Sequence, residues 1–452
     1  MDSPSVSSNS DSEFEHELSY FERIGGYLDA FSNSNAAYKV KRETKLTYAL
    51  DNLAGSPFVS FTSRVKSATF NLLVKGEDAG TWIKPDVAVL QKHATPSPFG
   101  RGAETVMDPT YRHGTELKSD ELAFVLKGHK QSRYQDFVIN IQEELRKSMF
   151  VGKKVVLKFY KLAIYGEGGH FDWHRDSTHS DAHHGTVLVA LNTEWEGGEL
   201  ILRHQGVEIS VDMHPTKYTT KSGDGLRAAI VAFYTDIEHK VMPVTKGTRL
   251  VLQYDVEVAE VPPQNWVSPP SYTPLKEAAH RHQHVESCID TYPNLDQKLV
   301  QAVVDEIKEL HKEGTTVVAF PLSHLYRKAS VKKKYLKGSD SALFDALENH
   351  FNVVLHPVLI RAIDDGSDCD FQERFFAHKY KSSEEDEEEF SHAEGQVLEY
   401  GVVKNASFYL PRASAILQLS LPNGVHLGNE AQIGGEARYF GAGMFVEPKS
   451  EE

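Results

Sequence analysis

The chain has 452 residues, of which 40% are hydrophobic and 10% aromatic, and its formal net charge is −15 at pH 7. This length suffices for two or three domains with a substantial core. The acidic balance argues against a general binder of nucleic acid or membrane surfaces, because such proteins present a basic surface. Cys288 and Cys369 are too few for a disulfide framework and indicate a reducing compartment.

The chain shows no targeting or membrane signal. Its first residues lack the basic and apolar regions of a signal peptide, and no run of 18 apolar residues occurs. We therefore expect a soluble protein of the cytoplasm or nucleus.

The chain divides into four predicted segments. Residues 1–18 are rich in Ser, Asp and Glu and are predicted to form a disordered tail. Residues 19–258 are predicted to form the first domain, with its core at about 150–257. A Pro-rich linker follows at 259–275, and residues 276–452 are predicted to form a second, α+β domain of unassigned role.

Short strands dominate the predicted first domain. They are expected at 58–61, 68–74, 154–165, 186–192, 198–202, 228–234 and 249–254, and one amphipathic helix is expected at 131–149. Such strands, separated by turn signals, are typical of a β-sandwich or barrel. Residues 95–116 and the polar insertion 204–225 are both predicted to be loops.

The second domain alternates helical and strand patterns. Helices are expected at 299–310, ended by Gly314, and at 341–349, with strands at 317–322 and 353–360 and further short strands over 399–446. The six acidic residues 384–389 are predicted to be a solvated loop.

One stretch, Tyr165 to Asp176, carries the chemical signal. His174 and Asp176 stand two residues apart, so in an extended strand both side chains point to the same face. His239 follows 65 residues after His174. Two imidazoles and one carboxylate form the 2-His-1-carboxylate set that binds non-haem Fe(II) and leaves open coordination positions.

Further residues extend this motif. Tyr165, Gly168, Phe171, His174 and Asp176 fit the pattern Tyr-x-x-Gly-x-x-Phe-x-x-His-x-Asp, and His239 and then Arg249 follow in order. Over about residues 150–257 the sequence resembles the catalytic core of prolyl 4-hydroxylase-type Fe(II)/2-oxoglutarate dioxygenases. The resemblance implies a double-stranded β-helix (jelly-roll) core with supporting helices, and hence an overall α+β chain.

The resemblance also implies a reaction and its cofactors. Fe(II) would be held by His174, Asp176 and His239, with 2-oxoglutarate and O₂ as cosubstrates and ascorbate as reductant. Arg249 would bind the distal carboxylate of 2-oxoglutarate, and Tyr165 would donate its hydroxyl to the same carboxylate or serve only as a core tyrosine. The implied reaction hydroxylates a C–H bond while 2-oxoglutarate is decarboxylated to succinate, with no side-chain general base.

The charge of Arg249 supports this role independently. A cation within an otherwise apolar strand is costly unless it is paired, and guanidinium binds a carboxylate through two parallel hydrogen bonds. We therefore expect Arg249 to face a bound anion.

Other histidines and lysines are given structural interpretations. His170, His179, His183 and His184 are predicted to be exposed loop residues, and His280, His282 and His284 to be solvated in the linker. Residues 332–337, with four lysines, are predicted to form an exposed helix face.

Three functions remain open at this stage. The first is hydroxylation of a protein or peptide, the second is hydroxylation of a small molecule, and the third is a catalytically silent binding scaffold. Nucleic-acid demethylation is disfavoured, because no second arginine closely follows Arg249 and the chain is acidic. The second domain is a candidate for a silent copy of the barrel, and no oligomeric state is predicted.

Overall fold

The computed structural model describes residues 40–53, 58–66, 71–101, 104–125, 132–150, 153–204, 207–220, 223–260, 297–326, 330–364, 371–378, 400–401, 406–411 and 442–449. The predicted N-terminal tail, most of the linker, the acidic run and both cysteines lie outside these residues. Within the described part, no helix combines the length and apolar character needed to cross a bilayer.

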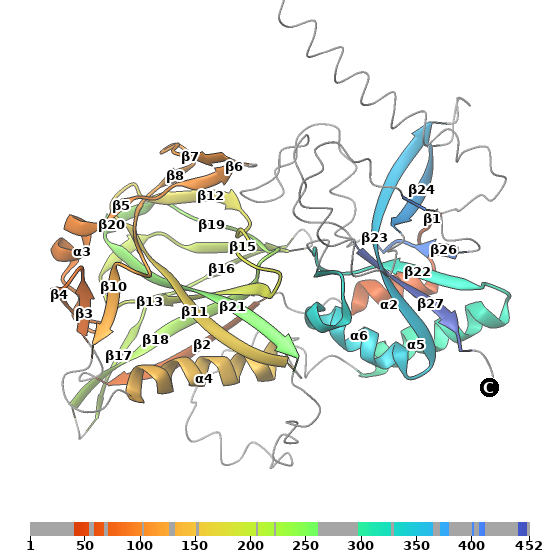
Figure 1. Ribbon diagram of the computed structural model, residues 1–452, viewed down its shortest axis with the longest axis horizontal. Coiled ribbons are helices and arrows are strands. Elements are labelled where there is room, and N and C mark those ends of the chain that lie inside the picture. Colours follow the sequence, from red (N-terminus) through yellow and green to blue (C-terminus); the bar gives the residue numbers. More distant parts are fainter. Residues whose placement is uncertain are drawn as a thin grey trace, which may run out of the picture.

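Two facing antiparallel sheets form a double-stranded β-helix in the first half of the chain (Figure 1). The larger sheet has the order β17-β18-β13-β21-β11-β9-β5, and β2 also pairs with β18. Its strands are β2 (Phe58–Lys66), β5 (Thr95–Pro96), β9 (Thr115–Lys118), β11 (Lys153–Tyr165), β13 (His183–Ala190), β17 (Thr216–Thr220), β18 (Gly223–Tyr234) and β21 (Arg249–Glu260). Every residue of β13 is buried, because this strand is central in the sheet, with β18 and β21 on either side.

The smaller sheet has the order β16-β15-β19-β12-β8. Its strands are β8 (Arg112–His113), β12 (His170–His174), β15 (Leu200–His204), β16 (Val207–Val211) and β19 (Glu238–Val241). The inner faces of the two sheets meet in one apolar core, which includes Leu188, Leu200 and Val251.

Smaller elements complete this part of the chain. They are a three-stranded sheet of β3 (Asn71–Val74), β4 (Glu77–Thr81) and β10 (Leu122–Val125), the pair β6 (Phe99–Arg101) and β7 (Glu104–Val106), and the pair β14 (Trp195–Gly197) and β20 (Val244–Gly247). Helix α3 (Val87–His93) begins at the N-cap Asp86, whose carboxylate accepts from Val89 N–H. Helix α4 (Ser132–Ser148) packs on β11 and buries Phe137, Ile141 and Leu145 (Figure 1).

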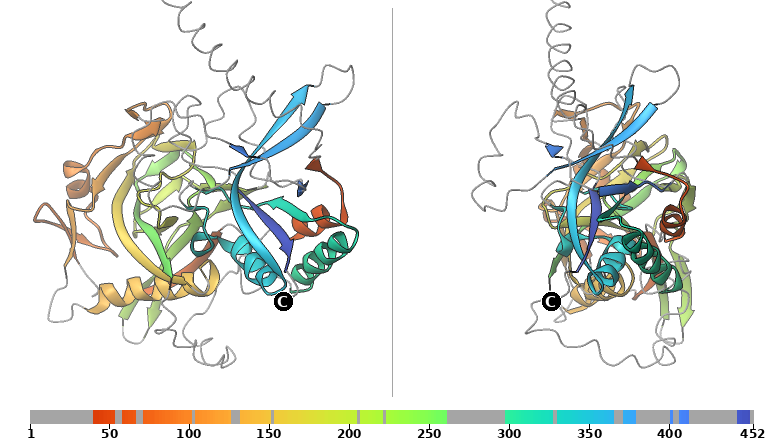
Figure 2. Two further views of the ribbon diagram at one scale, coloured as in Figure 1. Left: turned by 45° about the vertical axis from the view of Figure 1, so that its right-hand side comes forward. Right: turned by 90° about the vertical axis from the view of Figure 1, so that its right-hand side faces the viewer.

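A second sheet with its own core lies beside the β-helix (Figures 1 and 2). Its order is β1-β26-β22-β27-β23-β24-β25. The strands are β1 (Val40–Lys41), β22 (Val317–Pro321), β23 (Phe351–Asp364), β24 (Phe371–His378), β25 (Tyr400–Gly401), β26 (Ala406–Tyr409) and β27 (Ala442–Pro448). Helices α2 (Lys45–Asn52), α5 (Gln297–Lys312) and α6 (Gly338–Glu348) share its core, and a short 3-10 helix, η4 (Lys333–Tyr335), precedes α6. We call these elements the second unit.

Most of the predicted long elements are present. Helices α4, α5 and α6 and strands β11, β13, β18, β21, β22 and β23 occur where the patterns placed them, with ends shifted by a few residues. Gly314 follows α5 with φ +97°, and Thr315 N–H donates to Leu310 O at 3.0 Å, as in a helix ended by glycine.

Two predicted loops were wrong. Residues 95–116 contain β5 to β8 and the start of β9, and the insertion 204–225 contains β16 and β17. These strands have two to five residues each, too short for an alternating pattern, and they form because neighbouring strands supply their hydrogen-bond partners.

The predicted start of the first domain also differs from the structure. Residues 40–53 lie with the second unit, because β1 pairs in parallel with β26 and α2 buries Leu46 and Leu53 in the second core. At the other boundary, β21 extends to Glu260, into the predicted linker.

A substitution at Gly247, two residues before β21 begins, tests how closely the backbone is packed there. Its φ is +77°, and an added Cβ would lie 2.2 Å from Glu194 O. We expect Gly247→Ala to lower the free energy of unfolding by about 3 kcal/mol, because a left-handed alanine costs about 1 kcal/mol and the backbone overlap about 2 more.

Gly76→Ala is the matched control for denaturant unfolding. Gly76 also has a positive φ, +87°, but nothing lies within 4 Å of its added Cβ. This variant should lose only about 1 kcal/mol. Equal losses in the two variants would contradict the close packing at Gly247.

Candidate metal centre and active site

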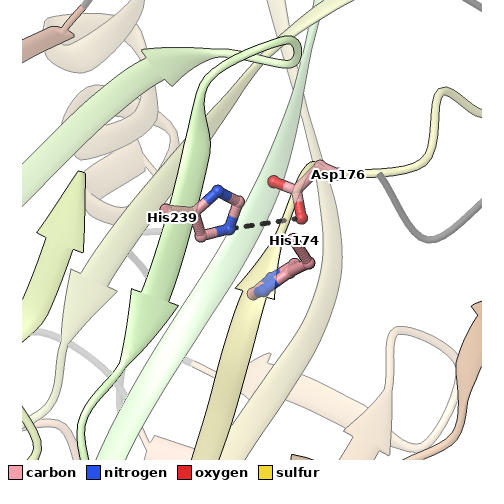
Figure 3. Close-up of side chains that lie close together, drawn as sticks. All are labelled: His174, Asp176 and His239. Atoms are coloured by element: carbon pink, nitrogen blue, oxygen red, sulfur yellow. Dashed lines mark ion pairs between the residues drawn. The ribbon is translucent and has the colours of Figure 1, made fainter. Parts of the chain in front are cut away.

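Strand pairing brings two histidines together. β12 and β19 are antiparallel neighbours, and His174 and His239 are direct partners in their register. The two ring centroids lie 4.1 Å apart. Asp176 follows two residues after the end of β12, and its Oδ1 lies 3.7 Å from His239 Nε2 (Figure 3). One ligand atom from each of the three residues falls within 4.8 Å of the others, so the set can hold a metal ion.

Hydrogen bonds define which imidazole nitrogens are available. His174 Nδ1 lies 2.7 Å from Asp172 O, and His239 Nδ1 lies 3.0 Å from Ile237 O. A carbonyl oxygen only accepts, so each Nδ1 carries a proton, and in the neutral imidazole the lone pair is then on Nε2. Burial, reinforced by His239, holds the pKa of His174 well below its ordinary value, which favours the neutral form that binds metals.

The carboxylate has its own anchor. Thr186 Oγ1, on the central strand β13, donates to Asp176 Oδ2 at 2.5 Å. This bond leaves Oδ1 directed toward His239. A ligand whose second oxygen is hydrogen-bonded is held in one orientation, which is typical of metal sites.

A second cluster, formed by His179, His183 and Asp255, has similar spacing but different chemistry. His183 Nδ1 accepts from the backbone N–H of His179 at 3.1 Å, and His183 Nε2 lies 3.0 Å from Gly185 O. Both ring nitrogens are therefore engaged with the backbone, and neither offers a lone pair to a metal. His179 Nδ1 lies 2.6 Å from Asp255 Oδ2, and this hydrogen bond raises the pKa of His179.

The prediction that these loop histidines are all exposed was wrong in part. His179 is exposed, but His183 and His184 are 2% and 3% exposed, because β13 begins at His183. Likewise, Lys333 lies half-exposed on η4 as expected, whereas Lys337 is buried. His280, His282 and His284 lie outside the described residues.

Arg249 lies in the same cavity as the three candidate ligands. It is 1% exposed, and burial lowers its pKa to about 10. Its Nη2 lies 3.2 Å from Met213 Sδ, its Nε has no hydrogen-bond partner, and it forms no ion pair with any described residue. Burying a guanidinium without an ion pair is costly, and a carboxylate is a partner that would offset this cost.

Tyr165 is adjacent to Arg249. The two residues are register partners on β11 and β21, and Arg249 Cζ lies 5.6 Å from the centre of the Tyr165 ring. Tyr165 lines the cavity and is 5% exposed. Its place beside the guanidinium is consistent with a shared ligand, and the donation of its hydroxyl to that ligand stays a prediction.

Three charged residues on the cavity wall were missed by sequence reasoning. Glu116 Oε2 accepts from Lys161 Nζ at 3.0 Å and from Arg112 Nη2 at 3.2 Å, and all three side chains are buried. Burial, with the charge of Arg112, lowers the pKa of Lys161 to about 8. Arg112 and Glu116 fall in the stretch predicted to be a loop. Lys161 did carry a signal, since it lies at even spacing from Tyr165 on β11, as an inward-facing residue should.

Comparison with known proteins agrees with this geometry. Residues 160–254 match the family model of the 2OG-Fe(II) oxygenase superfamily. Among curated proteins, no sequence matches the chain. The chain thus contains a domain of this superfamily and is a 2-oxoglutarate-dependent dioxygenase, an oxidoreductase.

Several solved structures are similar to the chain at low identity. A prolyl-4-hydroxylase from Pseudomonas putida is 15% identical over 47% of this chain and 98% of its own, with a TM-score of 0.28. A prolyl hydroxylase from Trichoplax adhaerens, in complex with a peptide fragment of the hypoxia inducible factor oxygen degradation domain, is 18% identical over 42% and 84%, with a TM-score of 0.28. A prolyl 4-hydroxylase from Phytophthora capsici is 16% identical over 62% and 94%, with a TM-score of 0.24.

The two histidine clusters can be distinguished by metal binding. We expect His174→Ala to abolish binding of one equivalent of Co(II), a spectroscopic substitute for Fe(II), because the variant removes a free Nε2 donor. His183→Ala should keep Co(II) affinity within about threefold while lowering stability, because His183 satisfies backbone groups instead. Co(II) absorption titrations measure both. Loss of binding in His183→Ala alone would assign the metal to the second cluster.

Proposed function

We propose that the chain hydroxylates a C–H bond of a protein or peptide, with Fe(II), O₂ and 2-oxoglutarate, and forms succinate. The observation that carries this proposal is one cavity that holds two histidines, a carboxylate and a buried arginine with no ion-pair partner among the described residues. The histidines and the carboxylate suit Fe(II), and the arginine suits the distal carboxylate of the cosubstrate.

The ligand roles follow from the orientations of the side chains. His174 and His239 present Nε2, and Asp176 presents Oδ1, from one side of the cavity. Bound Fe(II), with 2-oxoglutarate and O₂, supplies the oxidative decarboxylation and the oxidation of the substrate. Three protein ligands leave three metal positions for these molecules.

The remaining cavity residues would orient 2-oxoglutarate and exclude water from the metal. Arg249 would hold the distal carboxylate through a bidentate pair of hydrogen bonds, and Tyr165 would donate its hydroxyl to the same carboxylate. Leu188, Leu200 and Val251 form apolar walls that exclude water from the reacting centre. No side chain is assigned as a general base, and ascorbate would supply the reducing equivalents that keep the iron as Fe(II).

Other functions are less well supported. The order of the motif from Tyr165 to Arg249 resembles the prolyl 4-hydroxylase type, which favours a protein or peptide substrate over a small molecule. We place this activity in the cytoplasm or nucleus. A silent scaffold has no need to retain the three candidate ligands and an unpaired Arg249 in one cavity. The acidic net charge of the chain disfavours a nucleic-acid substrate.

Succinate formation tests the proposed reaction. Purified protein with Fe(II), ascorbate and 2-oxoglutarate should release succinate slowly even without substrate, and His174→Ala should reduce this release to background. Chromatographic measurement of succinate decides the outcome. Succinate release that is undiminished in His174→Ala would contradict the assignment of the metal ligands.

Arg249→Met separates cosubstrate binding from metal binding. Hydrogen bonds to charged groups contribute about 1.5–3 kcal/mol each, so losing one or two should raise the KM for 2-oxoglutarate about 100-fold. Co(II) affinity should stay within about twofold. The control is Lys246→Met, which removes the same charge from a 71% exposed side chain on β20 and should change neither value. Parallel loss of metal and 2-oxoglutarate binding in Arg249→Met would refute its role.

A further inference from the structure

The turn between β18 and β19 touches both sides of the metal centre. Residues 235–237 connect the strands, and Ile237 N–H donates to Tyr234 O at 3.0 Å. Ile237 O accepts a hydrogen bond from His239 Nδ1, and Asp236 O accepts one from Arg175 Nε at 2.9 Å. Arg175 stands between His174 and Asp176 in the chain. The backbone of this turn therefore orients one ligand directly and the segment that carries the other two.

The side chain of Asp236 points the other way, into the second unit. Its Oδ1 accepts from Lys337 Nζ at 2.8 Å. Its Oδ2 accepts from Leu325 N–H at 3.1 Å and lies 3.1 Å from His324 Nδ1. Asp236 is 7% exposed although it lies in a turn, and Lys337 is 2% exposed. Among the described residues, each hydrogen-bond partner of this carboxylate belongs to the second unit.

The partners of Asp236 are themselves held in place. Asp340, in the first turn of α6, accepts from the backbone N–H of Ser323 at 2.8 Å and of His324 at 3.1 Å, and from Tyr326 Oη–H at 2.8 Å. Lys337 N–H donates to Tyr326 Oη at 2.9 Å, and Lys337 Nζ donates to Leu325 O at 3.0 Å. The residues that bind Asp236 are thus held in a hydrogen-bonded network, so their positions do not depend on a single flexible side chain.

The charges also agree with this arrangement. Burial alone would raise the pKa of Asp236, but Lys337 and His324 override it and hold that pKa well below its ordinary value. The carboxylate is therefore ionised and paired. A buried pair adds little net stability compared with apolar packing, yet removing one partner is strongly disruptive, so such a pair fixes geometry.

We propose that the second unit is a positioning element of the metal centre, in which Lys337 and His324 clamp Asp236 and so hold the turn that orients His239 and Arg175. Lys337 and Asp236 are positioning residues and touch neither metal nor substrate. This inference rests on the proposed metal site. Because coupling is reciprocal, metal binding must in turn stabilise the contact between the second unit and the turn.

The test uses the full chain and Co(II) alone. Lys337→Met should raise the Co(II) dissociation constant about tenfold or more, which is the usual effect of removing a group that orients a metal ligand, and should alter the Co(II) d–d spectrum. Titrations are run at a temperature where circular dichroism shows the metal-free form of each variant to be folded.

Lys153→Met is the matched control. Lys153 is 7% exposed and donates to Leu336 O in the second unit, so it joins the same two parts of the chain without touching the turn. This variant should lose thermal stability, but its Co(II) affinity should remain within about twofold of the parent and its spectrum unchanged. Equal weakening in Lys153→Met would mean general loosening and would overturn the proposal.

A second variant covers the case in which Lys337→Met does not fold. Asp236→Asn keeps the shape and the hydrogen-bond acceptor but removes the charge, and it should also weaken Co(II) binding. Unchanged Co(II) affinity in whichever variant folds would falsify the positioning role. Retention of Co(II) by His174→Ala would instead refute the metal centre itself, so the two failures are distinguishable.

Discussion

The pairing of β12 with β19 is the constraint on which the site depends. Direct register between His174 and His239 places the two rings in contact, and a shift of one residue would send one ring to the opposite face of the sheet. Hydrogen bonds from each Nδ1 to a nearby backbone carbonyl then select the tautomer. The placement of the two histidines of the candidate metal centre therefore follows from backbone pairing.

A second feature of the site is that several charged side chains are buried in the lining of the cavity. Arg249 is buried with no ion-pair partner among the described residues, whereas Glu116 pairs with both Lys161 and Arg112 in the lining of the same cavity. The large sheet supplies Arg249, Lys161 and Glu116, from β21, β11 and β9, whereas Arg112 lies on β8 of the smaller sheet. Thus, among the described residues, the cavity has one cationic position without an ion-pair partner and one that is already paired.

The sequence predicted the parts of the structure that have local or motif-scale signals. Helices α4 and α5 have apolar residues at helical spacing, and β11 and β13 have long apolar runs. The candidate ligands were found through the spacing of His174 and Asp176. What failed were the short strands in 95–116 and 204–225, whose stability comes from neighbouring strands and not from their own composition. Asp236 and Lys337 are 101 residues apart, so no local pattern could reveal their contact.

The position of residues 40–53 has a consequence for how the chain must be assembled. β1 precedes the whole β-helix in sequence, yet it pairs with β26, and Lys41 bonds to Tyr409 across 368 residues. In effect the oxygenase fold is inserted into the second unit, which closes only after nearly the entire chain has been made. Such non-local pairing raises contact order and slows folding. A truncation after β21 would leave α2 without the core that buries Leu46, and it would also remove Lys337 and His324, the partners of Asp236.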